Sequence, residues 1–288
     1  MSAQRLKWGL LIILALIWGS SFILIKRGLV ALTPFQLGSL RIVFAAVFLL
    51  VIGLKSLTLI PLGKWKFIIL TALCGTFLPV YLFSFAQTEI NSSVSAILNS
   101  LTPLYTLLLG AFVFGLTFAR RQFFGVVIGL IGCMLLIFNG AINNPGQNYY
   151  YAILVVIASI CYALNVNLIK KHLSDLSPLS ITTGNFAVLL IPALVVLSFT
   201  DFFSMAAQPE VQHSVWFILI LGVVGTGIAN IIFFKLIQMS SPIFASSVTY
   251  LIPIVAFFWG LVDNESLTLV QFFGAFIILF GVYLSAKK

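Results

Sequence analysis

An internal repeat is the feature that most restricts what this chain can fold into. Apolar runs in the first half have counterparts in the second half, in the same order and at nearly constant offsets of 144, 150 and 149 residues. The matched runs are Ile17–Lys26 with Cys161–Lys170, Cys74–Thr76 with Val224–Thr226, and Gln122–Gly125 with Gln271–Gly274. An odd number of membrane crossings in each copy forces the second copy to enter the membrane upside down. Many transporters build two alternative conformations in this way.

The composition requires a membrane environment. The chain of 288 residues is 61% hydrophobic and only 7% charged, which is far from a soluble globular composition. A bilayer core about 30 Å thick needs roughly 20 apolar residues per helix. Ten runs of this kind are expected, at residues 8–26, 35–53, 66–86, 92–114, 122–139, 150–169, 179–199, 215–236, 242–262 and 268–285. Long continuous runs without strict alternation favour helices over barrel strands.

We therefore predict an all-α membrane protein of ten transmembrane helices, arranged as two inverted five-helix repeats over residues 1–143 and 144–288. The net charge of +9 is explained by its placement and is not a nucleic-acid footprint. The termini and even-numbered loops contain twelve Lys or Arg residues, whereas the odd-numbered loops contain only Lys26 and Arg27. By the positive-inside rule, both termini are expected in the cytoplasm, with the chain in the inner membrane.

The acidic residues and histidines are absent from the predicted span interiors. All of them fall in loops or at span ends: Glu89, Asp175, Asp201, Glu210, Asp263, Glu265, His172 and His213. Proton relays, intramembrane proteases and acidic cation pores all need such groups inside the membrane. The three cysteines show no metal-binding spacing. We therefore expect no enzyme, metal or cofactor, and a facilitator or exchanger rather than a proton-coupled carrier.

Arg41 lies within the second predicted span, seven residues after Pro34. A charge there is costly unless it has a partner, and no carboxylate lies within a span to pair with it. One interpretation is that Arg41 faces a polar cavity and attracts an anionic or carboxylate-bearing substrate. The other is that it snorkels to the outer surface or binds the carbonyls of a broken helix. The repeat-equivalent position is Asn185.

Polar and aromatic residues near predicted kinks complete the candidate substrate site. Asn99 and Asn165 are candidates for hydrogen bonding, although a single asparagine more often joins helices than binds a ligand. Trp18, Tyr81 and Tyr250 are candidates for an aromatic wall.

Four further residues are candidates for gating. Lys26 and Lys170 occupy equivalent ends of related spans, although lysines at such ends commonly snorkel to the interface. Pro103 and Pro253 are repeat-equivalent and release backbone carbonyls within their spans.

The ordered motifs resemble an EamA-type transporter of the drug/metabolite transporter superfamily. The residues that carry this resemblance are Trp18-Gly19-Ser20-Ser21-Phe22, Lys26, Pro34, Arg41, and Pro103 or Pro253 followed by Gln-Phe-Phe-Gly. The resemblance covers nearly the whole chain. It implies ten helices in two inverted five-helix repeats and the export of small metabolites, often amino acids or related solutes.

The two copies depart from the family pattern in different ways. The family often has a Glu after the fourth and ninth spans, which Glu265 fits in the second copy, whereas the first has Gly115-Leu116. The second copy replaces Trp-Gly with Tyr162-Ala163 and the arginine with Asn185. We therefore expect an asymmetric substrate site, in which the first half of the chain supplies the charged residue.

These observations lead to one preferred function and several alternatives. The preferred one is an alternating-access exporter of amino acids or related zwitterions and anions. The alternatives are a nucleotide-sugar or phosphate-ester antiporter, which would need several convergent cations, a membrane-embedded lipid-modifying enzyme, and a receptor or assembly scaffold. The substrate, the coupling ion and the oligomeric state are not determined by the sequence.

Overall fold

The described part of the chain consists of helices joined by short loops and turns. The computed structural model describes residues 3–117, 119–143, 148–263 and 269–286, and this part contains helices and no strands. Eight helical runs are long and apolar enough to cross a membrane. They are residues 4–28, 34–59, 62–86, 94–112, 152–172, 178–198, 209–239 and 242–262. The prediction of an all-α protein with membrane-spanning helices is confirmed for these residues.

The described residues of the first half form ten helical elements. They are α1 Ala3–Gly28, α2 Pro34–Gly53, η1 Leu54–Leu59, η2 Leu62–Lys64, α3 Trp65–Ala72, η3 Leu73–Phe77, α4 Leu78–Ala86, α5 Ser92–Asn99, α6 Thr102–Phe112 and α7 Arg120–Asn143.

The second half repeats this order closely. Its elements are η4 Tyr149–Tyr151, α8 Ala152–His172, α9 Pro178–Ser198, α10 Phe202–Met205, α11 Pro209–Gly222, η5 Val223–Ile228, α12 Ala229–Met239, α13 Pro242–Ser246, α14 Val248–Val262 and α15 Leu269–Ala286. The predicted spans 122–139 and 268–285 coincide with α7 and α15, except that residue 268 lies outside the described residues, as does Glu265.

The repeat seen in the sequence extends to helix starts. Thr33 caps α2 through a reciprocal box, in which its hydroxyl accepts from the Gln36 amide (3.3 Å) and the Gln36 side chain accepts from the Thr33 amide (2.9 Å). At the equivalent position Ser177 caps α9 by accepting from the Ser180 amide at 3.0 Å. A proline follows each cap, where its missing N–H and fixed φ suit the first helical turn.

Two π-helical turns occupy equivalent positions in the two halves. The turn η3 joins α3 to α4, and η5 joins α11 to α12. The matched triplets Cys74–Thr76 and Val224–Thr226 fall within these turns. A π turn widens the helix by one residue and is often found at functional sites.

Two predicted spans are interrupted near the middle of the bundle. Residues 92–114 divide into α5 and α6, and residues 242–262 divide into α13 and α14. The first break falls just before Pro103, which lies in the first turn of α6 and donates no backbone hydrogen bond. The two breaks are joined because the Ser100 hydroxyl donates to the Thr249 carbonyl at 2.7 Å.

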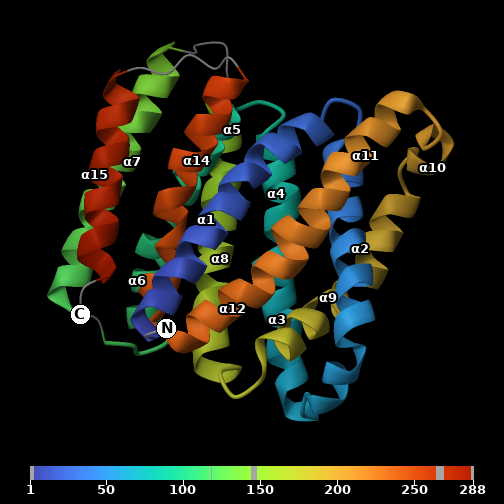
Figure 1. Ribbon diagram of the computed structural model, residues 1–288, viewed down its shortest axis with the longest axis horizontal. Coiled ribbons are helices and arrows are strands. Elements are labelled where there is room, and N and C mark those ends of the chain that lie inside the picture. Colours follow the sequence, from blue (N-terminus) through green and yellow to red (C-terminus); the bar gives the residue numbers. More distant parts are fainter. Residues whose placement is uncertain (1–2, 118, 144–147, 264–268, 287–288) are drawn as a thin grey trace.

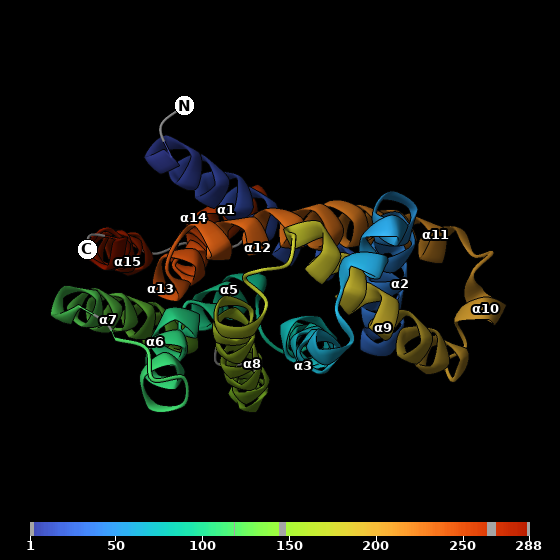
Figure 2. The same ribbon diagram turned by 90° about the horizontal axis from the view of Figure 1, so that it is seen from below.

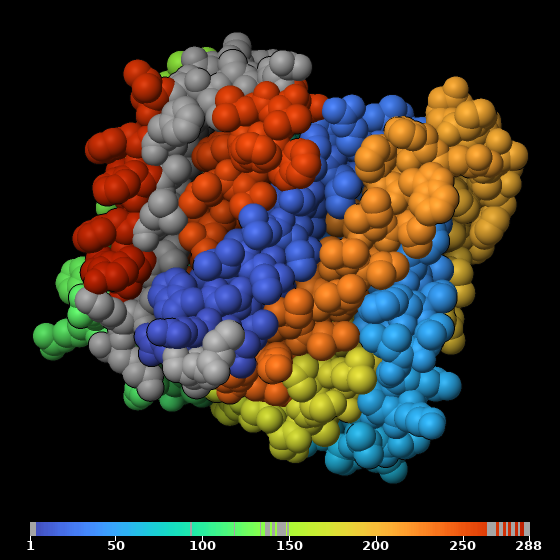
Figure 3. Space-filling model, in the orientation of Figure 1, coloured from blue at the N-terminus to red at the C-terminus, as the bar shows by residue number. Residues whose placement is uncertain are grey.

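Helices of one half pack mainly against helices of the other. Helix α1 packs on α14, α11 and α12, α2 packs on α9, α4 and α6 pack on α8, and α7 packs on α15. Figure 1 shows that α1 begins and α15 ends at the same end of the bundle. In the perpendicular view of Figure 2, the α7–α15 pair lies at one edge and α2 with α9 at the opposite edge. Figure 3 shows α1 lying between α14 and the α11–α12 run on one face.

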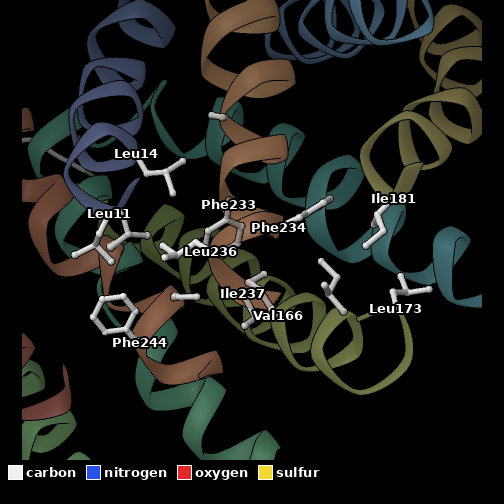
Figure 4. Packing of buried hydrophobic residues seen from close by; sticks show 14 of the residues in the cluster. Leu11, Leu14, Val166, Leu173, Ile181, Phe233, Phe234, Leu236, Ile237 and Phe244 are labelled. Carbon is white, nitrogen blue, oxygen red and sulfur yellow. The ribbon is translucent and has the colours of Figure 1, made fainter. Parts of the chain in front are cut away.

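A large apolar cluster fills the bundle near the start of α1. It joins α1, α8, α9, α12 and α13 through residues that include Leu11, Leu14, Val166, Leu173, Leu236 and Ile237 (Figure 4). Large apolar side chains on the outer surface are left exposed, among them Val51 and Phe199, as suits helices surrounded by lipid.

Candidate functional site

A cavity lies between the two halves at the level of the π turns and helix breaks. Its volume is about 800 Å³ with its opening included. Residues from α1, α2, α4, α5, α6, α8, α12, α13 and α14 line it together with both π turns. The polar groups in its wall include Arg41, Thr76, Asn99, Asn165, Thr226 and Asn230.

Arg41 is buried in the cavity wall, with 8% of its surface exposed. Its Nε donates to the Thr226 hydroxyl at 2.7 Å, and that hydroxyl donates in turn to the Leu221 carbonyl at 3.0 Å. None of the ion pairs found among the described residues involves Arg41. A cation in the membrane interior that faces a cavity and binds only neutral groups is suited to attract an anion.

Trp18 also binds the π turn of the second half. Its Nε1 donates to the Gly225 carbonyl at 3.0 Å, and its ring meets Phe233 edge-on at 4.8 Å between centroids. The turn η5 is therefore held from the first half by two side chains, Trp18 from α1 and Arg41 from α2. Both were predicted from the sequence as substrate-site candidates.

Asn165 lies against the other π turn. It is 3% exposed, and a Cβ built on Gly75 would lie 2.6–2.7 Å from its amide atoms. The Asn165 Oδ1 is buried without a hydrogen-bond partner among the described residues. Only glycine at position 75 lets the amide approach η3 this closely.

Asn99 ends α5 beside the break before α6 and also lines the cavity. The Thr102 hydroxyl donates to the Asn99 backbone carbonyl at 2.7 Å and lies 3.3 Å from the Asn99 Oδ1. Arg41, Trp18, Asn99 and Asn165, which lie far apart in the sequence, are thus brought to one cavity.

The sequence predicted an aromatic wall of Trp18, Tyr81 and Tyr250, and of these three residues only Trp18 is among the described residues that line the cavity. The Tyr81 hydroxyl bonds to the Ser39 hydroxyl at 2.8 Å, so the ring faces α2. Tyr250 is fully buried, and its ring lies next to Gly129 of α7. Neighbouring helix positions point about 100° apart, and spans that are apolar all round carry no pattern that shows the inner face.

The aromatic rings that do line the cavity are those of Trp18, Phe22, Phe83, Tyr162 and Phe233.

The two lysines predicted as gating residues lie away from the cavity. Lys26 forms an ion pair with Asp263 after α14, and Arg27 binds the same carboxylate at 2.5 Å. The hydrogen bond from Lys26 lowers the pKa of the Asp263 carboxyl, and the nearby Lys26 and Arg27 charges lower it further. Lys170 donates to three carbonyls at the end of α12, those of Ile237 (3.1 Å), Gln238 (3.2 Å) and Ser240 (2.7 Å).

Pro103 and Pro253 also stand outside the lining. Pro103 begins α6, and Pro253 lies inside α14.

Several lining residues were missed by the sequence interpretation, notably Thr76, Thr226 and Asn230. In the sequence, the repeated Gly-Thr pairs at 75–76 and 225–226 indicate only the internal repeat. Both pairs lie in the π turns, and the periodicity of an apolar span does not reveal a π turn. The described residues contain no group of three or more His, Cys, Asp or Glu side chains that could hold a metal ion.

A model of the EamA-like transporter family matches residues 6–138 and residues 150–287. The uncharacterized inner membrane transporter YedA of Escherichia coli K12 is 27% identical, with 96% of this chain and 89% of YedA covered. A probable amino-acid metabolite efflux pump of Salmonella typhimurium is 25% identical, covering 96% of this chain and 93% of the pump. An uncharacterized transporter of Archaeoglobus fulgidus is 25% identical, with 98% and 99% covered.

One crystal structure shares the fold of this chain. Its TM-score is 0.73 at 16% sequence identity, and the alignment covers 98% of this chain and 96% of that one.

Proposed function

Because the chain belongs to the EamA-like transporter family, we propose that it carries a small metabolite across the membrane by alternating access. In this proposal residues 1–143 and 144–288 form two five-helix repeats of opposite orientation, with ten spans in all. Rocking of one repeat against the other exposes the central cavity to each side in turn.

The observation that carries this proposal is the cavity between the halves with Arg41 in its wall. Arg41 comes from the first half and its partner Thr226 comes from the second. Any relative movement of the two halves changes this contact, so a substrate that binds Arg41 senses and biases the movement. The equivalent π turns and helix caps support a duplicated framework, as do the two ranges that the family model matches.

The substrate we propose is an amino acid or a related zwitterion or anion, exported from the cell. Arg41 binds its carboxylate, Asn99 and Asn165 provide hydrogen-bonding groups, and the Trp18 ring packs against its apolar part. The name of the Salmonella typhimurium relative, a probable amino-acid metabolite efflux pump, supports this class. The described lining residues include no carboxylate, which favours a facilitator or exchanger over proton coupling.

The bundle is closed at the end where α1 begins. Val166 and Phe233 belong both to the cavity lining and to the apolar cluster of Figure 4, which continues along α8 and α12 to Leu173 and Ile237. We assign this end to the cytoplasm because most basic residues flank spans there. We assign the chain to the inner membrane because its relative YedA is named an inner membrane transporter. The structure then corresponds to a carrier closed toward the cytoplasm.

Gating is proposed for the lysines at the two ends of the bundle. Lys26 joins α1 to the end of α14 through Asp263, and Lys170 joins α8 to the end of α12. Both contacts must break when the helices separate. Pro103 and Pro253 are proposed as points where α6 and α14 bend.

Counterflow in proteoliposomes tests the proposed function. The purified protein is reconstituted with unlabelled solute inside, and entry of labelled amino acids and organic carboxylates is measured with and without an imposed pH gradient. Saturable counterflow that ignores the gradient is expected. Accumulation driven by the gradient would retain the carrier but reject the facilitator.

Arg41→Ala is expected to reduce counterflow of an anionic substrate about 10- to 100-fold, whereas Arg121→Ala, at an exposed arginine outside the cavity, serves as the matched control and is expected to leave it unchanged. Absence of flux for every solute in correctly inserted protein would reject the proposal.

A further inference from the structure

The charge of the cavity wall is unbalanced. Arg41 is the one charged side chain among the described residues that line the cavity. The described acidic residues Glu89, Asp175, Asp201, Glu210 and Asp263 all lie outside the lining. An empty site of this kind has a net charge of +1, so a ligand with a net charge of −1 neutralises it.

A neutral hydrogen-bonding group finds partners in this wall. The hydroxyls of Thr102, Ser246 and Thr249 each donate to a backbone carbonyl, those of Asn99, Ile243 and Ser246 respectively. Each of these hydroxyls therefore already uses its single proton in a hydrogen bond. Its oxygen can still accept a hydrogen bond from a ligand. A ligand hydroxyl can donate to such oxygens without bringing a charge into the membrane interior.

An ammonium group is less well accommodated. It would share a cavity with the Arg41 guanidinium, and the wall offers it hydroxyl and amide oxygens but no carboxylate among the described residues. Like charges repel strongly where the dielectric constant is low, and a buried charge without a counter-charge is costly. The zwitterion of an amino acid would satisfy Arg41 with its carboxylate but leave its ammonium uncompensated.

The remainder of the wall suits an apolar body. Phe22, Ile25, Val80, Phe83, Phe233 and Ile252 supply aromatic and branched apolar side chains. Ligand pockets commonly combine such a surface with a few polar groups that fix the orientation.

We propose that the cavity selects a monoanionic carboxylate with an apolar body and a neutral hydrogen-bonding group, such as a 2-hydroxy acid, over the amino acid of the same skeleton. This inference rests on the proposed transport function. It narrows the substrate class from zwitterions and anions to net monoanions.

A pair of ligands with one skeleton tests the charge argument. Leucine and 2-hydroxy-4-methylpentanoate differ only in the group at the second carbon, which is an ammonium in one and a hydroxyl in the other. Their dissociation constants are measured by titration calorimetry on the full-length protein, and both are then tested in counterflow. The hydroxy acid is expected to bind at least about tenfold more tightly, as follows from the cost of the unpaired ammonium.

Two variants and one control test whether the charge of the cavity wall, rather than its shape, sets the preference for the hydroxy acid. Arg41→Gln is expected to remove the preference by weakening the hydroxy acid, whereas Arg121→Gln is expected to preserve it. Asn99→Asp leaves the backbone carbonyl that accepts from the Thr102 hydroxyl in place and adds a carboxylate to the wall. This variant is expected to shift the preference at least about tenfold toward leucine, because its ammonium then has a counter-charge.

The two proposals fail in distinguishable ways. Counterflow of leucine with an affinity equal to or greater than that of the hydroxy acid would overturn the monoanion inference and leave the carrier intact. An unchanged preference in Asn99→Asp would also overturn it. If the protein neither binds nor exchanges either compound or any other carboxylate, both the inference and the proposed function are rejected.

Discussion

The two π turns occupy equivalent positions in the two halves, yet different side chains hold them. Arg41 and Trp18 bind η5 through hydrogen bonds of 2.7 and 3.0 Å. Asn165 faces η3 with a buried oxygen that has no partner among the described residues.

Asn185, the equivalent of Arg41, lies away from the cavity. Its amide lies 3.0 Å from the Thr71 hydroxyl of α3. When the amide nitrogen points toward Thr71, it donates to the Ile68 and Ile181 carbonyls at 3.1 and 3.2 Å. The two halves thus share a backbone framework at these turns, while the side chains that contact the turns differ. The first half supplies the charge.

Replacing the residues at these equivalent positions tests the contrast most directly. Arg41→Ala is expected to reduce transport of an anionic substrate about 10- to 100-fold, since a hydrogen bond to a charged group contributes about 1.5–3 kcal/mol. Asn185→Ala, which changes a buried group outside the cavity, is expected to change transport far less. Initial rates of counterflow in matched proteoliposomes measure both. Equal losses in the two variants would contradict the asymmetry.

The partner of Arg41 is expected to show a smaller effect. Thr226→Val removes the hydroxyl that accepts from Arg41 and donates to the Leu221 carbonyl. Loss of these bonds is expected to lower the free energy of unfolding by about 1–3 kcal/mol, because a buried donor is left unsatisfied. Thermal unfolding in detergent measures this change. Thr76→Val, at the equivalent cavity-lining position in η3, is the matched control, and the comparison fails if it destabilises the protein as much.

The glycines of the two π turns are expected to differ as well. Gly75→Ala brings a methyl group against the Asn165 amide and is expected to cost about 1–3 kcal/mol through overpacking. Gly225→Ala meets the Leu221 Cδ1 and the Ser21 Oγ at 3.0 Å, which are the tips of movable side chains, and is expected to cost less. Thermal unfolding of both variants measures the difference. Recovery of stability in the double variant Gly75→Ala/Asn165→Ala would assign the cost to this contact, and no recovery would argue against it.

The ion pairs at the two ends of the bundle are expected to give the smallest effect. Hydrogen bonds from Lys26 to Asp263 and from Lys64 to Asp175 lower the pKa of each carboxyl. A carboxyl with a lowered pKa stabilises the folded state above its unfolded pKa of about 4, and this contribution is lost as the pH falls through the lowered value.

Variants at the two carboxylates measure this loss in the pH dependence of thermal stability. Asp263→Asn is expected to flatten the acid side of the profile more than Asp175→Asn, because the Asp263 side chain is 15% exposed and that of Asp175 is 60% exposed. For the exposed pair the change is expected to stay below about 1 kcal/mol. Identical profiles for the two variants would contradict the expected difference between the ends.

The pattern of apolar residues in the sequence located the spans, but it did not show which side of each span faces the cavity. The helices α2 and α9 start at Pro34 and Pro178, directly after the cap residues Thr33 and Ser177, and both Thr-Pro and Ser-Pro are visible in the sequence. The split of residues 92–114 at Ser100 was not predicted, although Pro103 marked the place. Tyr81 was predicted to line the cavity because it is an aromatic residue near a predicted kink, whereas the residue that lines it is the neighbouring Val80. One step along a helix turns a side chain by about 100°, and an apolar span does not show which direction is inward.

The sequence by itself determined that the chain is helical, crosses a membrane repeatedly, contains a duplicated pattern and has an arginine among its apolar residues. These properties depend on composition, run length and order, which lipid constrains directly because every backbone polar group in it must be satisfied within the helix. Only the tertiary structure decided that Arg41 meets Thr226, that Asn185 turns away, and that the π turns face the cavity. Those outcomes depend on contacts between residues more than 100 positions apart, and they are set by how the two halves pack against each other.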